Sequence, residues 1–154
     1  MQILTHNFLS RRGLEKLHAK IPTALTRWLE NLKVYGEHNI ETESVFVEGC
    51  KYAMWIGTKW SVAPHTDDGF PEWSYILIVR NEGMVVHSIE DTSGDHQKQP
   101  PNTILELNIH ALHWLSPGTE VNDPTWVSLV IDSDKQLKKE DVLARFRKLT
   151  RHII

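Results

Sequence analysis

The segment that most constrains the fold is Trp73–Val79, WSYILIV, in which apolar residues occupy both sets of alternating positions. A strand that is apolar on both faces has to be covered on both sides, so this segment is predicted to be a central strand between two layers. Asn81–Gly83 gives a turn signal directly after it. Met84–Ile89 is therefore predicted to be its hairpin partner.

Further strands are predicted wherever β-branched and aromatic residues gather between turn signals. The remaining polar stretches, residues 90–102 and 116–124, are predicted to be loops. The short spacing between the strands favours antiparallel pairing over βαβ units. The predicted strands are Val45–Val47, Lys51–Ile56, Thr103–Ile109 and Thr125–Asp132.

Helices are predicted at both ends of the chain. Apolar residues recur at helical spacing over Ser10–Lys33, with Ser10 as N-cap and a break near Ile21 imposed by Pro22. A second helical region is predicted over about residues 135–151. We therefore expect one domain, residues 1–154, of the mainly β (α+β) class. It would be a β-sandwich or jelly-roll barrel over about 45–132, with the N-terminal helices (about 10–33) and the C-terminal helix as buttresses.

Composition excludes several classes of protein. The net charge of −3 gives no broad basic surface, so nucleic-acid binding is disfavoured as the main function. The basic residues near the C-terminus are predicted to be the solvated face of a helix, with a nucleic-acid contact there as the alternative. Cys50 is the only cysteine, which rules out an internal disulfide framework. Without an apolar run of about 18 residues, no membrane span is expected, and we predict a soluble, cytoplasmic protein.

The motif His65-Thr66-Asp67 is either half of a metal site or part of a polar loop. Chance alone gives roughly 0.5 His-x-Asp pairs in this composition, so the motif is weak by itself. Residues i and i+2 of a strand, however, point to the same face about 7 Å apart and can converge on one ion. Two histidines and one carboxylate form the facial triad of non-haem Fe(II) oxygenases.

The third ligand would come from the segment TILELNIHALHWL. If strand alternation persists, His113 shares the inward, apolar face with Ile109, whereas His110 shares the polar face with Asn108. His113 is therefore the predicted ligand and His110 the alternative, because a β-bulge would reverse their orientations.

At this point the sequence resembles a family. HTD, PPNTILELNIHALHWLSPG and WVSLVID resemble the double-stranded β-helix core of the 2-oxoglutarate- and Fe(II)-dependent dioxygenases, over roughly residues 45–132. The resemblance implies that His65, Asp67 and His113 bind Fe(II) and that 2-oxoglutarate is the cosubstrate. Most members also carry an Arg about ten residues after the distal histidine, and Pro124–Trp126 stands there instead.

Some branches of that family take the cation from the strand after His-x-Asp, which would assign Arg80 to the 2-oxoglutarate carboxylate, assisted by Tyr75. The alternatives are a solvated Arg80 paired with Glu82 and a core tyrosine. Core and rim packing is the favoured explanation of tryptophans in strands, and the alternative is that Trp55, Trp60, Trp73 and Trp114 form the pocket wall.

Three functions follow from these observations. The leading one is a Fe(II)- and 2-oxoglutarate-dependent oxygenase acting on a protein side chain, a small metabolite or a base. The second is a cupin-like metal protein that does not use 2-oxoglutarate, which the missing Arg favours. The third is a non-catalytic binding module on the same barrel.

Overall fold

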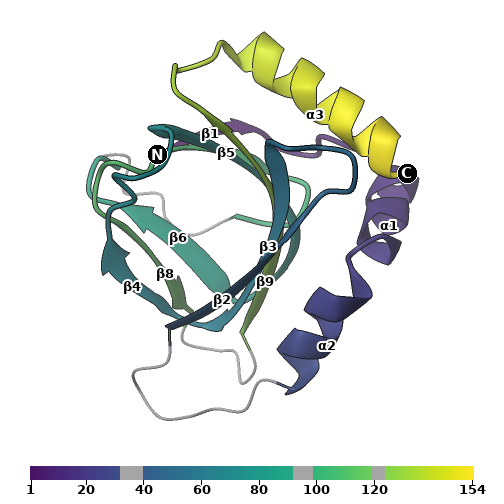
Figure 1. The fold of residues 1–154 in the computed structure, drawn as a ribbon, viewed down its shortest axis with the longest axis horizontal. Coiled ribbons are helices and arrows are strands. Elements are labelled where there is room, and N and C mark those ends of the chain that lie inside the picture. The colour runs from purple at the N-terminus through teal and green to yellow at the C-terminus, as the bar shows by residue number, and fades with distance from the viewer. Residues whose placement is uncertain (32–39, 92–98, 119–123) are drawn as a thin grey trace.

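The computed structural model describes residues 1–31, 40–91, 99–118 and 124–154. Its nine described strands form two antiparallel sheets that face each other (Figure 1). The larger sheet has the order β1-β7-β5-β9-β3-β2, and the smaller has the order β4-β8-β6. The strands are β1 (Gln2–Thr5), β2 (Ile40–Phe46), β3 (Ala53–Trp60), β4 (Val62–His65), β5 (Trp73–Glu82), β6 (Met84–Ser88), β7 (Ile104–Asn108), β8 (His113–Pro117) and β9 (Thr125–Ser133).

Three helices, α1 (Arg11–Ala19), α2 (Thr23–Asn31) and α3 (Lys139–Ile153), cover the outer face of the larger sheet (Figure 1). The hydroxyl of Ser10 caps α1 by accepting a hydrogen bond from the Gly13 N–H at 3.0 Å. Pro22 separates α1 from α2, as predicted, because proline cannot continue a helix through its own N–H. The mainly β jelly-roll class with helices at both ends is thus confirmed.

The core has two layers, one on each face of the larger sheet. The outer layer packs the helices on the sheet, with Leu17, Leu29 and Phe146 fully or almost fully buried. The inner layer lies between the two sheets and includes Ile78 and Leu105. Each large apolar side chain removed from water contributes about 1.5–3 kcal/mol.

β5 belongs to both layers, as its sequence predicts. Tyr75 and Leu77 point to the helices, whereas Ile76 and Ile78 point to the smaller sheet. β5 lies between β7 and β9, which confirms a central strand. Its two apolar faces therefore hold the two layers of the molecule together.

α2 approaches the larger sheet closely at one glycine of β3. A Cβ atom on Gly57 would lie 2.8 Å from Cδ1 of Leu25, which is closer than real Cβ contacts come. Leu25 is fully buried at this position. The lack of a side chain at Gly57 thus sets how near α2 can pack.

The strand predictions differ from the structure in two ways. Met84–Ile89 is not the hairpin partner of β5, because β6 pairs with β8 in the other sheet and the chain crosses between the sheets at Gly83. The strands β1, β4 and β8 were not predicted, and β8 pairs with both β4 and β6. Large parts of the predicted loops at 90–102 and 116–124 lie outside the described residues.

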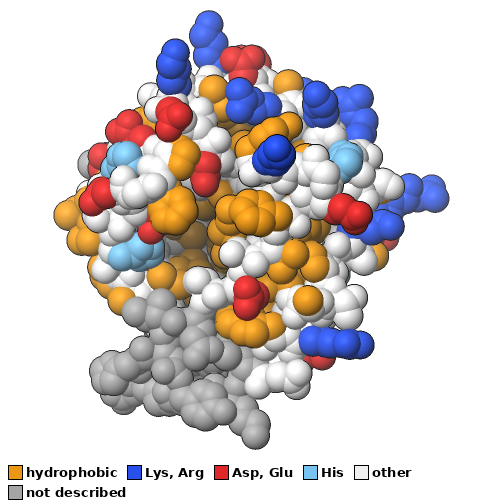
Figure 2. Space-filling model, in the orientation of Figure 1, with side chains coloured by type: hydrophobic (Ala, Val, Ile, Leu, Met, Phe, Trp, Pro, Cys, Tyr) orange, Lys and Arg blue, Asp and Glu red, His pale blue; other side chains and the backbone are white. Residues whose placement is uncertain are grey.

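Charge is divided unevenly between the helices and the rest of the chain. Residues 10–31 and 134–154 contain twelve Lys and Arg against five Asp and Glu, whereas the remaining sequence contains five against fifteen. Figure 2 shows Lys and Arg gathered mainly along the side that α1 and α3 occupy in Figure 1. None of the helices in the described ranges is both long enough and apolar enough to cross a bilayer.

Candidate metal centre

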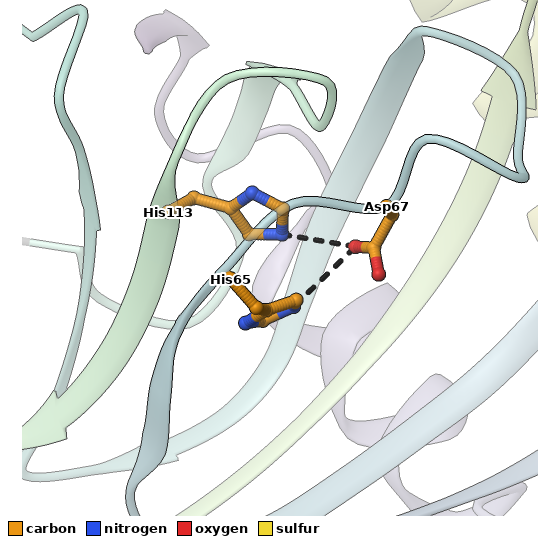
Figure 3. Close-up of side chains that lie close together, drawn as sticks. All are labelled: His65, Asp67 and His113. Atoms are coloured by element: carbon orange, nitrogen blue, oxygen red, sulfur yellow. Dashed lines mark hydrogen bonds and ion pairs between the residues drawn. The ribbon is translucent and has the colours of Figure 1, made fainter.

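His65 and Asp67, two residues apart in sequence, meet the distant His113 at one end of the smaller sheet (Figure 3). β4 ends at His65, Asp67 follows in the next loop, and β8 begins at His113. His65 and His113 are register partners in the β4–β8 pairing, which places their rings side by side with centroids 4.3 Å apart. The Asp67 N–H donates to the Ile109 carbonyl at 2.8 Å and so ties its loop to the β7–β8 turn.

The ligand atoms of these residues converge on one point. The Nε2 atoms of His65 and His113 lie 3.4 and 3.0 Å from the same oxygen, Oδ2 of Asp67. One potential ligand atom from each residue lies within 4.8 Å of those of the other two. The His113 side chain is 9% exposed, and those of His65 and Asp67 are 37% and 32% exposed.

Backbone carbonyls fix both imidazole rings. Nδ1 of His65 lies 2.7 Å from the Ala63 oxygen, and Nδ1 of His113 lies 2.8 Å from the Ala111 oxygen. A carbonyl can only accept a hydrogen bond, so each Nδ1 carries a proton. Each ring therefore directs its Nε2 toward the carboxylate of Asp67.

This arrangement fits a metal cation. A positive charge, either a proton on a ring or a metal cation between the ligands, holds two Nε2 atoms this close to one carboxylate oxygen. Metal-binding histidines commonly donate their other ring N–H to a carbonyl or carboxylate, which is the arrangement of both rings here. Two imidazoles and one carboxylate suit Fe(II) and related transition metals, with coordination positions left for other molecules.

The triad opens into a cavity of about 760 Å³ between the two sheets. Its walls are mainly apolar, as the hollow in Figure 2 shows. Small hydroxyl side chains interrupt the apolar surface, including Thr58 and Ser128. A volume of this size is typical of sites for small molecules.

A second carboxylate lines the same cavity. Asp132 on β9 pairs with Ser74 on β5, and the Ser74 hydroxyl donates a hydrogen bond to it. Burial raises the pKa of Asp132, the hydrogen bond from Ser74 opposes this shift, and the nearby charge of Asp67 adds to it. Asp132 was not predicted, although alternation along β9 places it on the face of Trp126, Ser128 and Val130.

Of the two histidines considered for the third position, the structure brings His113 to the triad. His110 is exposed, and its Nε2 bonds to the Phe70 carbonyl at 2.7 Å. The premise of a continuous strand was wrong, because β7 ends at Asn108 and a turn precedes β8. His113 enters the cavity as the first residue of a new strand.

Arg80 does not reach the cavity, which corrects its predicted contact with a cosubstrate. A bulge between Ile78 and Arg80 sets Arg80 opposite Val127, whose side chain belongs to the outer layer. Without that bulge, Arg80 would oppose Trp126, which lines the cavity. Instead the Arg80 guanidinium pairs with Glu82, with Nε 3.0 Å from Oε1, as the alternative interpretation predicted.

Tyr75 also points away from the cavity, as a core tyrosine. It is fully buried in the outer layer, and its hydroxyl accepts a hydrogen bond from the Leu137 N–H at 2.7 Å. Burial raises the pKa of this hydroxyl, an effect that the hydrogen bond from Leu137 counters and Glu106 reinforces. Tyr75 therefore fastens the segment before α3 to the sheet.

The tryptophans divide between the core and the cavity. Trp114 lines the cavity, as predicted, together with Trp126, which was not among the four candidates. Trp55 and Trp73 pack in the outer layer. Trp60 ends β3, and its side chain lies outside the described part of the structure.

No protein-family model matches the chain, and no curated protein matches it. The solved structures that match it include several described as cupins. A cupin 2 domain-containing protein from Halorhodospira halophila is 14% identical, with 74% of this chain and 81% of that chain covered and a TM-score of 0.42. The cupin domain of Drosophila melanogaster CENP-C is 11% identical, with 77% and 97% covered and a TM-score of 0.41.

An RmlC-like cupin family protein with a double-stranded β-helix fold, from Methanocaldococcus jannaschii, is 9% identical. The match covers 67% of this chain and 91% of that chain, with a TM-score of 0.39. The jelly-roll assignment rests on the strand order of this chain itself.

Proposed function

We propose that this protein binds a divalent transition metal through His65, Asp67 and His113 and uses it on a small molecule held in the cavity between its sheets. The observation that carries the proposal is the convergence of two Nε2 atoms on one carboxylate oxygen. A bound ion of this donor set would supply Lewis acidity and, as Fe(II), the capacity to activate oxygen. The protein would be a cupin-like metal protein, and its enzymatic activity is part of the proposal.

The residues around the triad support this function in two ways. The Ala63 and Ala111 carbonyls hold both imidazoles in the orientation that ligation needs, so little reorganisation accompanies binding. The apolar walls of the cavity lower the effective dielectric constant beside the triad and strengthen electrostatic interactions there.

The second candidate is the oxygenase that uses 2-oxoglutarate. It is favoured by the His-x-Asp motif at the end of β4 and the distal histidine at the start of β8. The charge of the cavity lining argues against this second function. No Lys or Arg occurs among the described residues that line it, whereas a buried dicarboxylate needs a cationic partner. We therefore rank the cupin-like function first.

The test is thermal unfolding of metal-stripped protein with Mn(II), with and without 2-oxoglutarate. Mn(II) at about 100 times its dissociation constant adds roughly 2.7 kcal/mol to the free energy of unfolding. His65→Ala should lose this increment. His110→Ala should keep it, because that exposed ring lies outside the triad.

The outcomes separate the three functions. Stabilisation by Mn(II) alone supports the cupin-like protein, and a further increment from 2-oxoglutarate supports the oxygenase. If neither compound raises the unfolding temperature of the wild-type protein, the metal site is refuted. The non-catalytic binding module would then be the remaining function.

A further inference from the structure

The ionisable side chains that line the cavity, within the described part of the chain, are all carboxyl or imidazole groups. Among the described lining residues they are His65, Asp67, His113 and Asp132. The carboxylate of Asp67 is directed at the two imidazoles. Of these four residues, only Asp132 is not part of the metal triad.

Asp132 is separate from the metal group. Its carboxylate is not among the ligand atoms that lie within 4.8 Å of one another. It comes from the larger sheet, whereas His65 and His113 come from the smaller one. A ligand between the sheets could therefore contact Asp132 from one side while facing the metal site from the other.

The surroundings of Asp132 leave it able to bind a donor. The Ser74 hydroxyl holds the carboxylate from the neighbouring strand, and Ser74 itself is 4% exposed. A carboxylate offers about four lone-pair positions, and one hydroxyl proton occupies one of them. Burial raises the pKa of Asp132, so a positive charge beside it would offset the cost of its desolvation.

We infer that the cavity takes a small molecule with a protonated amine, whose ammonium group pairs with Asp132 and whose apolar body occupies the space between the sheets. Val130, Ile76 and Leu107 provide apolar wall for that body. The position of the ammonium group relative to the metal rests on the proposed function. The pairing with Asp132 rests on the cavity alone.

The test is calorimetric titration of the Mn(II)-loaded and the metal-free full chain with hexylamine, 1-hexanol and hexanoate. These probes share one apolar chain and differ in the charge of the head group. A charge-assisted hydrogen bond exceeds a neutral one by about 1–2 kcal/mol, so hexylammonium should bind roughly tenfold more tightly than hexanol. Asp132→Asn should remove this preference in both forms, and Asp132→Glu should retain part of it.

Asp68→Asn is the matched control. Asp68 adjoins the triad and is exposed, and its Oδ2 accepts a hydrogen bond from Thr66 rather than lining the cavity. This variant removes the same charge and should keep the preference for hexylammonium. Equal affinity for hexylammonium and hexanol in the wild type, or a preference that survives Asp132→Asn, overturns the inference.

The two proposals fail in different ways. Loss of Mn(II) binding with an intact preference for hexylammonium in metal-free protein would refute the metal site and leave Asp132 as an ammonium site. Mn(II) binding without any preference would refute only the ammonium site. Tighter binding of hexanoate than of hexylammonium by metal-free protein would also overturn the ammonium site, since a carboxylate would then be the preferred head group.

Discussion

Replacing Asp67 by Asn should have opposite effects on the metal-free and the metal-loaded protein. In metal-free protein with both rings neutral, the Asp67 carboxylate faces two nitrogen lone pairs at 3.0 and 3.4 Å. An Asn side chain would turn its NH2 group toward His113 and convert an acceptor–acceptor contact into a hydrogen bond. Such a bond contributes about 1 kcal/mol.

The size of the effect on the unfolding temperature follows from chain length. The entropy of unfolding is about 2.1 cal/mol/K per residue, or about 0.3 kcal/mol/K for 154 residues. Metal-free Asp67→Asn should therefore unfold about 3 °C above the wild type. With Mn(II) at about 100 times the wild-type dissociation constant, the wild type gains about 8 °C. A variant that binds about 100-fold more weakly gains only about 1 °C.

Differential scanning calorimetry at pH 8.5, with EDTA or with Mn(II), measures both shifts. The two curves should exchange order between the conditions. Asp68→Asn should unfold at the wild-type temperature with EDTA and with Mn(II), because that carboxylate faces Thr66 and not the imidazoles. If Asp67→Asn lowers the unfolding temperature equally with EDTA and with Mn(II), Asp67 stabilises the fold itself and the lone-pair argument is refuted.

Three further predictions concern residues outside the triad. Arg80→Ala should leave Mn(II) stabilisation unchanged and cost at most about 1 kcal/mol, since Arg80 pairs with Glu82 away from the cavity. A changed Mn(II) response in calorimetry would contradict this. Tyr75→Phe should cost about 1 kcal/mol in urea unfolding, because the partly buried Leu137 N–H loses its acceptor, and an unchanged midpoint would refute it. The raised pKa of Asp132 means that the folded protein binds that proton more tightly than the unfolded chain. The resulting stability is present below the ordinary Asp range and is lost as pH rises through the folded pKa. Asp132→Asn should therefore stabilise metal-free protein at pH 7, by an amount that shrinks toward pH 4, and a gain that grows on acidification would contradict the sign.

Sequence patterns predicted the elements that depend on a single residue or a short segment. Pro22 ends α1 because of its own ring, and the two apolar faces of Trp73–Val79 require a covered strand wherever the fold places it. The three residues of the triad were also predicted, because the resemblance to the dioxygenase family supported a His-x-Asp motif that is weak by itself. Alternation along Thr125–Asp132 could have identified Asp132 as well.

The partners of the strands and the orientation of Arg80 depend on long-range pairing, which sequence patterns do not reveal. The turn at Asn81–Gly83 looks the same whether the next strand returns to β5 or crosses to the other sheet. The orientation of Arg80 depends on one bulge between β5 and β9, which leaves no signal in the composition of either strand. β1 has only four residues and is recognisable as a strand through its pairing with β7.

The concentration of basic residues in the helical segments gives the molecule a pronounced electric dipole. Residues 10–31 and 134–154 carry a net charge of +7, and the remainder of the sequence carries −10. An approaching cation is therefore repelled by the helical layer and attracted toward the rest of the surface, which orients encounters before contact. Because the Debye length is only about 8 Å at physiological ionic strength, this orientation acts over the last few molecular layers of water. Association rates of charged ligands should accordingly fall or rise with added salt according to the sign of the ligand, even where the final affinity hardly changes.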